Sequence, residues 1–324
     1  MTQAELGAAR GAGPGAGPAS TGRPAARADL RGSPGERRKG HLAMLAFSAI
    51  VAGSFPLGGL AAPHVDPAAL TALRLVLAAA VVGGVALAGP GLHRAQFRAP
   101  WRYLLLGALF GAYFALMFEG LKTAEPVATS AVFTLVPLLS AGFGWMLLRQ
   151  RMTARLALAL GIGALGAVWV IFRGDPGALL GFHLGRGEQI YFLGCVAHGL
   201  YTPLVARLNR GEPAVAFTFG TLLAGAGLMC LWAFPSILAT DWLSLPPIVW
   251  VTLLYVGVFA SAVTGVLLQF ASLRLPAAKV MAYTYLTPSW VIAWEVMLGR
   301  GLPPLMLFGG VGLTVVALLI LLKD

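Results

Sequence analysis

The stretch PVATSAVFTLVPLLSAGFGWMLL (Pro126–Leu148) contains no charged side chain and carries a proline, Pro137, at its middle. A helix of about 20 apolar residues spans the hydrocarbon core of a bilayer, so this stretch is long enough to cross one. The later stretch AAKVMAYTYLTPSWVIAWEVML (Ala277–Leu298) is similarly long and apolar and places Pro288 at the equivalent point. The two stretches predict a membrane-spanning helix that occurs twice in the chain.

The composition of the whole chain agrees with a membrane protein. Of its 324 residues, 58% are hydrophobic and 11% are charged, whereas soluble globular chains contain about 25% charged residues. Too few polar side chains remain to cover a water-soluble body of this length. The chain has only two cysteines, Cys195 and Cys230, which excludes a disulfide scaffold.

Further apolar runs lie on both sides of these two stretches, separated by short polar breaks. Helices are expected, because a barrel would show ten-residue strands with alternating polarity. The fold class predicted is all-α integral membrane, with ten transmembrane helices. The expected spans are Leu42–Ala62, Pro67–Leu87, Trp101–Leu121, Pro126–Leu148, Ala154–Phe172, Glu188–Leu208, Pro213–Phe234, Pro246–Phe270, Ala277–Leu298 and Pro303–Leu322. Gly107 and Gly111 predict a face for close helix packing.

Lysine and arginine are divided unequally between the two sides of the predicted bundle. With the N-terminus in the cytoplasm, 18 of the 23 Lys and Arg residues fall on the cytoplasmic side, four fall on the other side and Arg74 lies within a span. Positive charge accumulates in cytoplasmic loops, so an N-in, C-in protein of the cytoplasmic (inner) membrane is predicted. The net charge of +11 is therefore a topology signal and does not indicate a nucleic-acid partner.

Residues 1–40 are rich in Gly, Pro, Ala and basic residues and have almost no large apolar side chains. Such a segment buries too little surface to offset its chain entropy, so a disordered cytoplasmic tail is expected. Arg37, Arg38 and Lys39 are expected near anionic headgroups, which makes membrane lipids a partner.

The two halves of the chain, residues 41–173 and 187–323, resemble each other. The matched pairs are Gly53 with Gly199, Phe55 with Tyr201, Phe118 with Phe270, and Pro137 with Pro288. Each half holds five predicted spans, and because five is odd, the second half must be inverted relative to the first. In secondary transporters with inverted repeats, the substrate binds near the midplane between the repeats.

Short motifs recur in both halves. They are Leu121-Lys122-Thr123 before Pro137, Leu148-Arg149-Gln150-Arg151-Met152-Thr153, Gly161, Leu273-Arg274-Leu275 before Pro288, Gly299-Arg300-Gly301, Gly309-Gly310, and Pro67-Ala68-Ala69-Leu70 with Arg74. A chain with these motifs resembles the EamA-type carriers of the drug/metabolite transporter superfamily. Many members carry Glu where this chain has Gln150 and Arg300, so the resemblance assigns no coupling role to these two positions.

The resemblance implies a secondary transporter that moves a small organic metabolite by alternating access. It implies export more often than import, driven by a proton gradient or by the gradient of the substrate itself. Protons are therefore a candidate coupling ion. Direct use of ATP is unsupported, because the sequence has no Walker A pattern.

Four prolines lie within predicted spans one, four, six and nine and are expected to interrupt those helices: Pro56, Pro137, Pro203 and Pro288. A proline inside a helix removes one hydrogen bond and clashes with the preceding turn. Pro137 and Pro288 occupy equivalent positions, and we interpret them as hinges around a central cavity. Ordinary kinks are the alternative.

The ionisable groups within the spans are Arg74, Glu119, His198 and Glu295. Charges in the bilayer are unfavourable, so such groups are functional candidates. Arg74 is expected to pair with Glu119 or to receive a substrate carboxylate; the alternative is a structural pair near the outer surface, with both glutamates in water. His198 is expected to bond substrate or to carry a proton, and a bond to a neighbouring helix carbonyl is its alternative.

Aromatic residues are densest in span nine. Tyr283, Thr287, Trp290 and Trp294 have the spacing of one helix face. Together with Phe55, Tyr113 and Tyr201, they are predicted to line an aromatic cavity suited to amphiphilic metabolites or amino acids. For each of these residues, packing without substrate contact is the alternative.

An intramembrane enzyme and a transport-inactive sensor or scaffold are the competing classes. An enzyme needs a nucleophile with a base, or metal ligands, converging within the membrane. The sequence has no HExxH or G-x-S-x-G pattern and no aspartate within a predicted span. No catalytic residue, metal site or cofactor is therefore predicted, and the oligomeric state and the substrate stay open.

Overall fold

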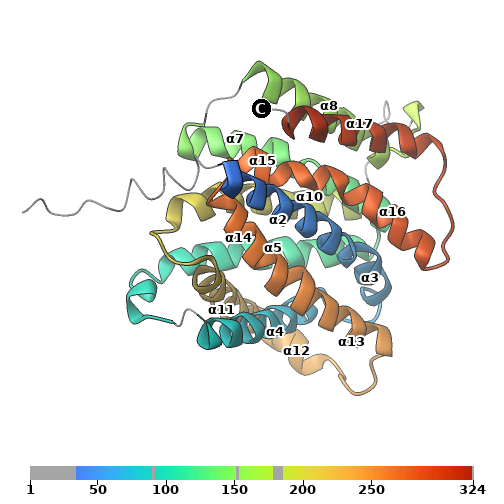
Figure 1. Cartoon of the computed structure of the whole chain (residues 1–324). Coiled ribbons are helices and arrows are strands. Elements are labelled where there is room, and N and C mark those ends of the chain that lie inside the picture. Colours follow the sequence, from blue (N-terminus) through green and yellow to red (C-terminus); the bar gives the residue numbers. More distant parts are fainter. Residues whose placement is uncertain (1–33, 90–91, 151–152, 178–184, 323–324) are drawn as a thin grey trace, which may run out of the picture.

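The computed structural model describes residues 34–89, 92–150, 153–177 and 185–322, and in this part of the chain it contains helices and no strand. The helices pack side by side in one bundle (Figure 1). Residues 1–33 of the expected tail and the motif residues Arg151 and Met152 lie outside the described residues.

The first half of the chain contains α2 (Pro34–Ala52), α3 (Ser54–Ala61), α4 (Pro67–Ala88), the 3₁₀-helix η1 (Arg94–Phe97), α5 (Trp101–Leu121), α6 (Pro126–Phe133), α7 (Val136–Leu148) and α8 (Ala154–Ile171). The second half contains α10 (Arg186–Leu208), α11 (Ala214–Trp232), α12 (Phe234–Ala239), α13 (Pro247–Leu254), the π-helix η2 (Tyr255–Val263), α14 (Thr264–Ser272), α15 (Ala277–Ala282), the 3₁₀-helix η3 (Tyr283–Leu286), α16 (Thr287–Met297) and α17 (Met306–Leu322).

Consecutive elements join into helical runs that lie where the sequence predicts spans. Seven of these runs among the described residues are long and apolar enough to cross a membrane. Three other predicted spans are helical but fall outside that group. The helix α10 carries Arg186, Glu188 and Arg207, the run α15–α16 is broken by η3, and α17 is only 17 residues long.

The predicted disordered tail is too long, because Pro34–Gly40 form the first two turns of α2. Proline is favourable at the first helical position, and an acidic residue is favourable in the first turn. Glu36 accepts from Lys39 at 2.8 Å and from Arg274 at 2.7 Å. Arg274 lies far away in the sequence, so the sequence alone could not show this anchor for the start of α2.

Corresponding helices of the two halves lie together at the edges of the bundle. The helix α17 packs against α8 at one edge, and α4 packs against α11 at the other (Figure 1). In the middle, α2 contacts α14 and α16, while α10 contacts α5 and α7. The core thus lies between the two halves and contains side chains from both.

Close helix contact at one of these places requires glycine. A Cβ atom on Gly107 of α5 would collide with the backbone nitrogen of Gly225 on α11 and lie 2.8 Å from its Cα. Gly111, one turn further on, faces Met229 in the same way. The close-packing face predicted from these glycines is confirmed, and it joins α5 to the second half.

Three of the four prolines follow a break in a helix. Pro56 lies in the first turn of α3, just after the break at Gly53, and Pro137 and Pro288 lie in the first turns of α7 and α16. A proline is well tolerated there, because the first turn of a helix has no hydrogen bond for its nitrogen to make.

Pro203 does not interrupt its helix, contrary to the prediction, since α10 continues from Arg186 to Leu208. A proline at this position cannot donate to the carbonyl of Gly199, four residues earlier. The hydroxyl of Ser140 on α7 donates to that carbonyl at 3.2 Å. A side chain from a neighbouring helix thus replaces the missing backbone bond, which is how membrane helices accommodate proline.

Ser140→Ala should lower the free energy of unfolding by about 1–2 kcal/mol, because it leaves the buried Gly199 carbonyl without a donor. Pro203→Ala restores a backbone N–H at the position that can reach this carbonyl. In the Pro203→Ala background, Ser140→Ala should therefore have little effect. Denaturation in detergent of the four proteins of this double-mutant cycle checks the expectation, and an equal loss in both backgrounds would contradict it.

Candidate functional site

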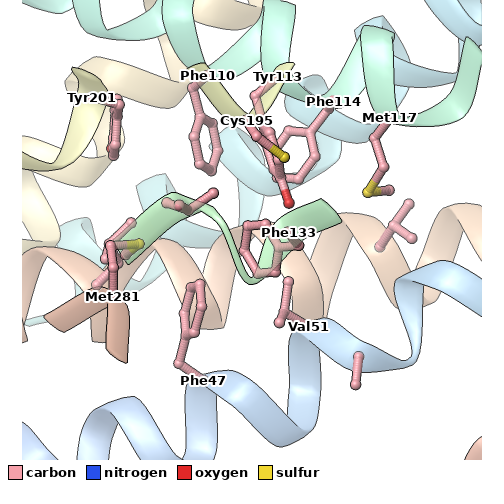
Figure 2. Close-up of a cluster of buried hydrophobic side chains, with 14 of the residues drawn as sticks. Phe47, Val51, Phe110, Tyr113, Phe114, Met117, Phe133, Cys195, Tyr201 and Met281 are labelled. Carbon is pink, nitrogen blue, oxygen red and sulfur yellow. The ribbon is translucent and has the colours of Figure 1, made fainter. Parts of the chain in front are cut away.

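A small pocket lies in the middle of the bundle, between helices of both halves. Its cavity volume is about 10 Å³. The lining residues come from α2 (Phe47, Val51), α5 (Phe110, Tyr113, Phe114), α10 (His198), η2 (Ala260) and α14 (Thr264, Gly265, Leu268). Figure 2 shows Phe47 and Val51 on one side, facing Phe110, Tyr113 and Phe114 on the other. The walls are mainly aromatic and aliphatic, with His198 and Thr264 as polar groups.

His198 lies within a stack of aromatic rings beside the pocket. Its ring centroid is 4.4 Å from that of Tyr113 and 5.9 Å from that of Tyr201, with the Tyr201 ring nearly parallel. The rings of Phe110 and Phe133 also contact it. The imidazole is 2% exposed, and neither ring nitrogen has a hydrogen-bond partner. The alternative interpretation of His198, a bond to a neighbouring helix carbonyl, is therefore not met.

Phe55 joins this aromatic cluster through other members. Its ring lies 6.0 Å from those of Phe133 and Tyr191, and the hydroxyls of Tyr191 and Tyr113 are 3.0 Å apart. The hydroxyl of Tyr201 accepts from Gln269 on α14 at 3.1 Å. Four residues predicted from the sequence to line an aromatic site thus lie in one cluster: Phe55, Tyr113, His198 and Tyr201.

Arg74 of α4 is fully buried beside the same pocket. Its Nε donates to Ser261 Oγ at 2.6 Å and its Nη2 to the Ala260 carbonyl at 2.8 Å. The guanidinium carbon lies 3.3 Å from the centre of the Phe114 ring. Phe114 and Ala260 both line the pocket, so Arg74 forms the layer directly behind its wall.

The Ala260 carbonyl that accepts from Arg74 lies in the π-helix η2. In a regular α-helix, the Ala260 carbonyl would accept from the amide of Thr264. Here the Thr264 amide donates to Phe259 and Ser261 instead, and the Ala260 carbonyl accepts from the guanidinium. π-Helical turns occur frequently at functional sites.

The charge of Arg74 is only partly compensated. A cation over an aromatic face gains about 2 kcal/mol when desolvated, whereas burying an ion costs several kcal/mol. Among the residues that the structure describes, no carboxylate forms an ion pair with Arg74, and its Nη1 is buried without a hydrogen-bond partner. The site therefore contains a buried positive charge, and the N–H groups on Nη1 of Arg74 have no hydrogen-bond acceptor.

Two segments of the chain, residues 38–172 and 185–323, match the model of the EamA-like transporter family. The chain belongs to this family. One match falls in each half of the EamA-like chain, in agreement with the duplication seen in its motifs, and the membership is consistent with the drug/metabolite transporter superfamily.

The EamA-like chain is 26% identical over 252 residues to the uncharacterized transporter YyaM of Bacillus subtilis (strain 168), and the match covers 76% of this chain and 82% of that protein. A solved crystal structure of a protein with 23% identity has the same fold, with a TM-score of 0.67 and coverage of 90% of this chain and 98% of the other. The family and the relative indicate a multi-pass transporter of the cell membrane that handles a small molecule, and they favour a transporter over an enzyme.

The structure does not pair Arg74 with Glu119 in this EamA-like protein. Glu119 lies near the end of α5 and accepts from Lys122 at 2.8 Å, with both side chains partly in solvent. Glu295 near the end of α16 pairs with Arg300 at 3.2 Å. Both glutamates belong to ion pairs near helix ends; Glu119 is partly in solvent, whereas the Glu295 side chain is only 12% exposed, so the alternative of two glutamates in water describes Glu119 alone.

The aromatic face of span nine lies away from the pocket and packs on α2. The hydroxyl of Tyr283 is 3.1 Å from His41 Nδ1, and Trp290 Nε1 donates to Ser48 Oγ at 3.3 Å. Trp290 is 38% exposed. The prediction that Tyr283 and Trp290 share a cavity with the residues of the aromatic cluster is not met in this structure.

The other two residues of that face also lie elsewhere. Trp294 packs edge-on against Tyr255 with 5.8 Å between ring centroids, and Thr287 is buried with an unpartnered hydroxyl. Thr287, Trp290 and Trp294 all belong to α16, so they keep the spacing of one face, and the packing of α16 directs that face away from the pocket. The 3₁₀-helix η3 changes only the angular position of Tyr283 relative to them, by about 20° per residue.

Several lining residues were not predicted from the sequence: Phe47, Val51, Phe110, Phe114, Ala260, Thr264, Gly265 and Leu268. The signal that could have found many of them is spacing by four along one helix face. Phe47 and Val51 are spaced in this way, and so are Phe110 and Phe114. Because similar spacing also occurs on faces that contact lipid, the pattern alone does not separate pocket from surface.

A second buried arginine closes one end of the bundle, on the side predicted to be cytoplasmic. Arg102 donates to Glu212 at 2.9 Å and to the Leu208 carbonyl at 2.6 Å, and both charged side chains are less than a tenth exposed. This pair ties α5 to the loop between α10 and α11. Among the described residues, no group of His, Cys, Asp or Glu side chains could hold a metal ion.

Glu212→Gln should lower the free energy of unfolding by about 3 kcal/mol at pH 7, because it leaves the buried Arg102 without a counter-charge. Burial raises the pKa of Glu212, but hydrogen bonds from Arg102 and from the backbone of Arg210 lower it more, so its pKa lies below the ordinary value. The stabilisation is therefore complete above the unfolded pKa of about 4.3 and disappears as the pH falls through the folded pKa.

Thermal unfolding in detergent between pH 7 and pH 3 measures this difference, and the curves of wild type and Glu212→Gln should converge at the acidic end. Glu125→Gln is the matched control, since Glu125 pairs with Arg173 at 3.1 Å with both side chains more than 60% exposed. Exposed pairs contribute little. An equally large loss in the control would contradict the role of the buried pair.

Proposed function

We propose that this EamA-like protein is a secondary transporter that exports a small organic metabolite, an amino acid or an amphiphilic aromatic compound, across the cytoplasmic membrane by alternating access. The observation that carries the proposal is the composition of the pocket wall. The wall is built by the first and third helical runs of each half, α2 and α5 with α10 and η2–α14. A site shared in this way is expected between the repeats of a secondary transporter.

The proposed architecture is ten spans in two inverted repeats, residues 41–173 and 187–323, with both termini in the cytoplasm. The helix contacts support it, because each has a counterpart. The pairing of α2 with α14 corresponds to that of α10 with α5, and the pairing of α2 with α16 corresponds to that of α10 with α7. Such exchange of partners is what a two-fold relation between the halves produces.

The size of the pocket supports alternating access. Pockets that hold small molecules usually measure about 300–1,000 Å³, whereas this cavity measures about 10 Å³, which is room for about one water molecule. A substrate therefore enters only when helices move apart. In this proposal, the structure corresponds to a closed state between an inward-open and an outward-open form.

The breaks near Pro137 and Pro288 are the proposed hinges. They lie at equivalent points of the two halves, between α6 and α7 and between η3 and α16. Pro56 follows a similar break in the first run and is proposed to act with them. Pro203 is proposed to weaken α10 locally without acting as a hinge, because α10 is continuous at this position.

Val51→Trp should abolish transport, since the larger ring would occupy the space between α2 and α5 that the substrate needs, and size-exclusion chromatography in detergent checks that the variant is folded. Uptake of radiolabelled phenylalanine and 3-phenylpropanoate into proteoliposomes measures it. Val85→Trp is the matched control, because Val85 is 55% exposed on the outer face of α4. Equal flux in Val51→Trp and wild type would refute the pocket as the route. If wild type shows no flux of these two compounds or of the other probes named below, the transport proposal itself would be refuted.

A proton role is proposed for His198, the titratable side chain other than tyrosine that lines the pocket. In that case, His198→Ala should remove the acceleration of flux by a pH gradient. The measurement is initial flux with and without the gradient in the same proteoliposomes. Acceleration that persists in the variant would exclude His198 as the proton carrier, and flux without any gradient effect in wild type would make the protein a uniporter.

A further inference from the structure

Two fully buried arginines in this protein differ in their surroundings. Arg102 has a buried carboxylate, Glu212, at 2.9 Å. Arg74 has none, although it is equally inaccessible to water. An arginine stays protonated in proteins and needs an anionic partner when it is buried. The contrast shows that this fold supplies a counter-charge to one buried arginine and leaves the other without one.

The guanidinium of Arg74 is held in a fixed orientation. Ser261 and the Ala260 carbonyl hold its Nε and Nη2, and the ring of Phe114 covers its face. Its Nη1 carries two N–H donors that have no partner. A planar guanidinium that is already oriented matches a carboxylate well, because it loses little freedom when it binds one.

A second polar group without a partner lies on the same pocket. Both nitrogens of His198 are buried and unbonded, and His198 lines the pocket directly. A continuous series of ring contacts, from His198 through Tyr113 to Phe114, connects it with Arg74. The pocket thus has apolar and aromatic walls, one unbonded imidazole and one uncompensated cation behind Phe114.

We propose that the transported metabolite is an aromatic monocarboxylate, with its carboxylate on Arg74 and its ring in the pocket between α2 and α5. This inference rests on the proposed transport function and names its substrate class. Rotation of the Phe114 ring, when the helices move apart, would open the way from the pocket to Arg74.

The same walls argue against an amino acid or an amine. None of the residues that line the pocket is Asp or Glu. The two glutamates considered as functional candidates, Glu119 and Glu295, are engaged by Lys122 and Arg300. An ammonium group in the pocket would therefore have no counter-charge. Charge complementarity favours an anion with no positive group of its own.

The test compares matched probes on the purified full-length protein in detergent. Benzoate, 3-phenylpropanoate and indole-3-acetate are each measured against the corresponding amide, and 3-phenylpropanoate also against 3-phenylpropylamine and phenylalanine. At least one carboxylate should bind at least tenfold more tightly than its amide. No binding by any of the three carboxylates, or equal or tighter binding of an amide, the amine or phenylalanine, would overturn the proposal. This series needs no variant, so it stands even if changes at Arg74 impair folding.

Variants then test whether the preference for a carboxylate depends on the positive charge of Arg74. Arg74→Gln should remove the preference for carboxylate over amide and leave amide binding unchanged, whereas Arg74→Lys should keep part of the preference. Lys122→Gln, which removes a positive charge at a helix end, should leave the preference unchanged. A full preference in Arg74→Gln overturns the assignment. If wild type transports a neutral or cationic compound and Val51→Trp blocks that flux, the proposed substrate class is overturned, whereas the transporter proposal stays in place.

Discussion

The hydrocarbon core of a membrane offers no water, so every backbone N–H and C=O within it must find a partner inside the protein. Where this chain departs from regular α-helix, side chains supply those partners. Ser140 donates to the carbonyl freed by Pro203, Tyr255 donates to Ile50 near the break between α2 and α3, and Arg74 donates to Ala260 in the π-helix. In each case the donor and the acceptor belong to different halves of the chain, so neither half satisfies its irregular backbone alone.

The pocket and the irregular stretches of backbone lie in the same part of the molecule, between the two halves. The pocket lies between the halves, among the helices that carry the breaks and the π-helix. A single net hydrogen bond contributes about 0.5–1.5 kcal/mol, so a small number of such bonds between the halves can be exchanged for others as helices shift. The closely packed pair Gly107 and Gly225 holds α5 of the first half against α11 of the second. The proposed movement would therefore fall on the helices that carry the breaks.

Much of the helical architecture was predictable from the sequence, because a bilayer requires long apolar runs with polar or charged ends. The bounds of α5 and α6–α7 agree with the predicted spans to the residue, and Phe55, Tyr113, His198 and Tyr201 do form one cluster. The prediction failed for the aromatic face of span nine. The helix α16 packs on α2 with Trp290 bonded to Ser48, and the sequence does not show which neighbour a helix face contacts.

The sequence by itself determined that this protein is helical, lies in a membrane and consists of two related halves, since hydrophobic run length and repeated motifs depend on neighbouring residues alone. Only the tertiary structure decided which ionisable groups are compensated. Arg74 and Arg102 are similar in the sequence, each a single arginine in or beside an apolar run. Arg102 meets a carboxylate from a residue 110 positions away, Glu212, and Arg74 is oriented by a hydroxyl from a residue 187 positions away, Ser261. Contacts over that separation arise only when the helices pack.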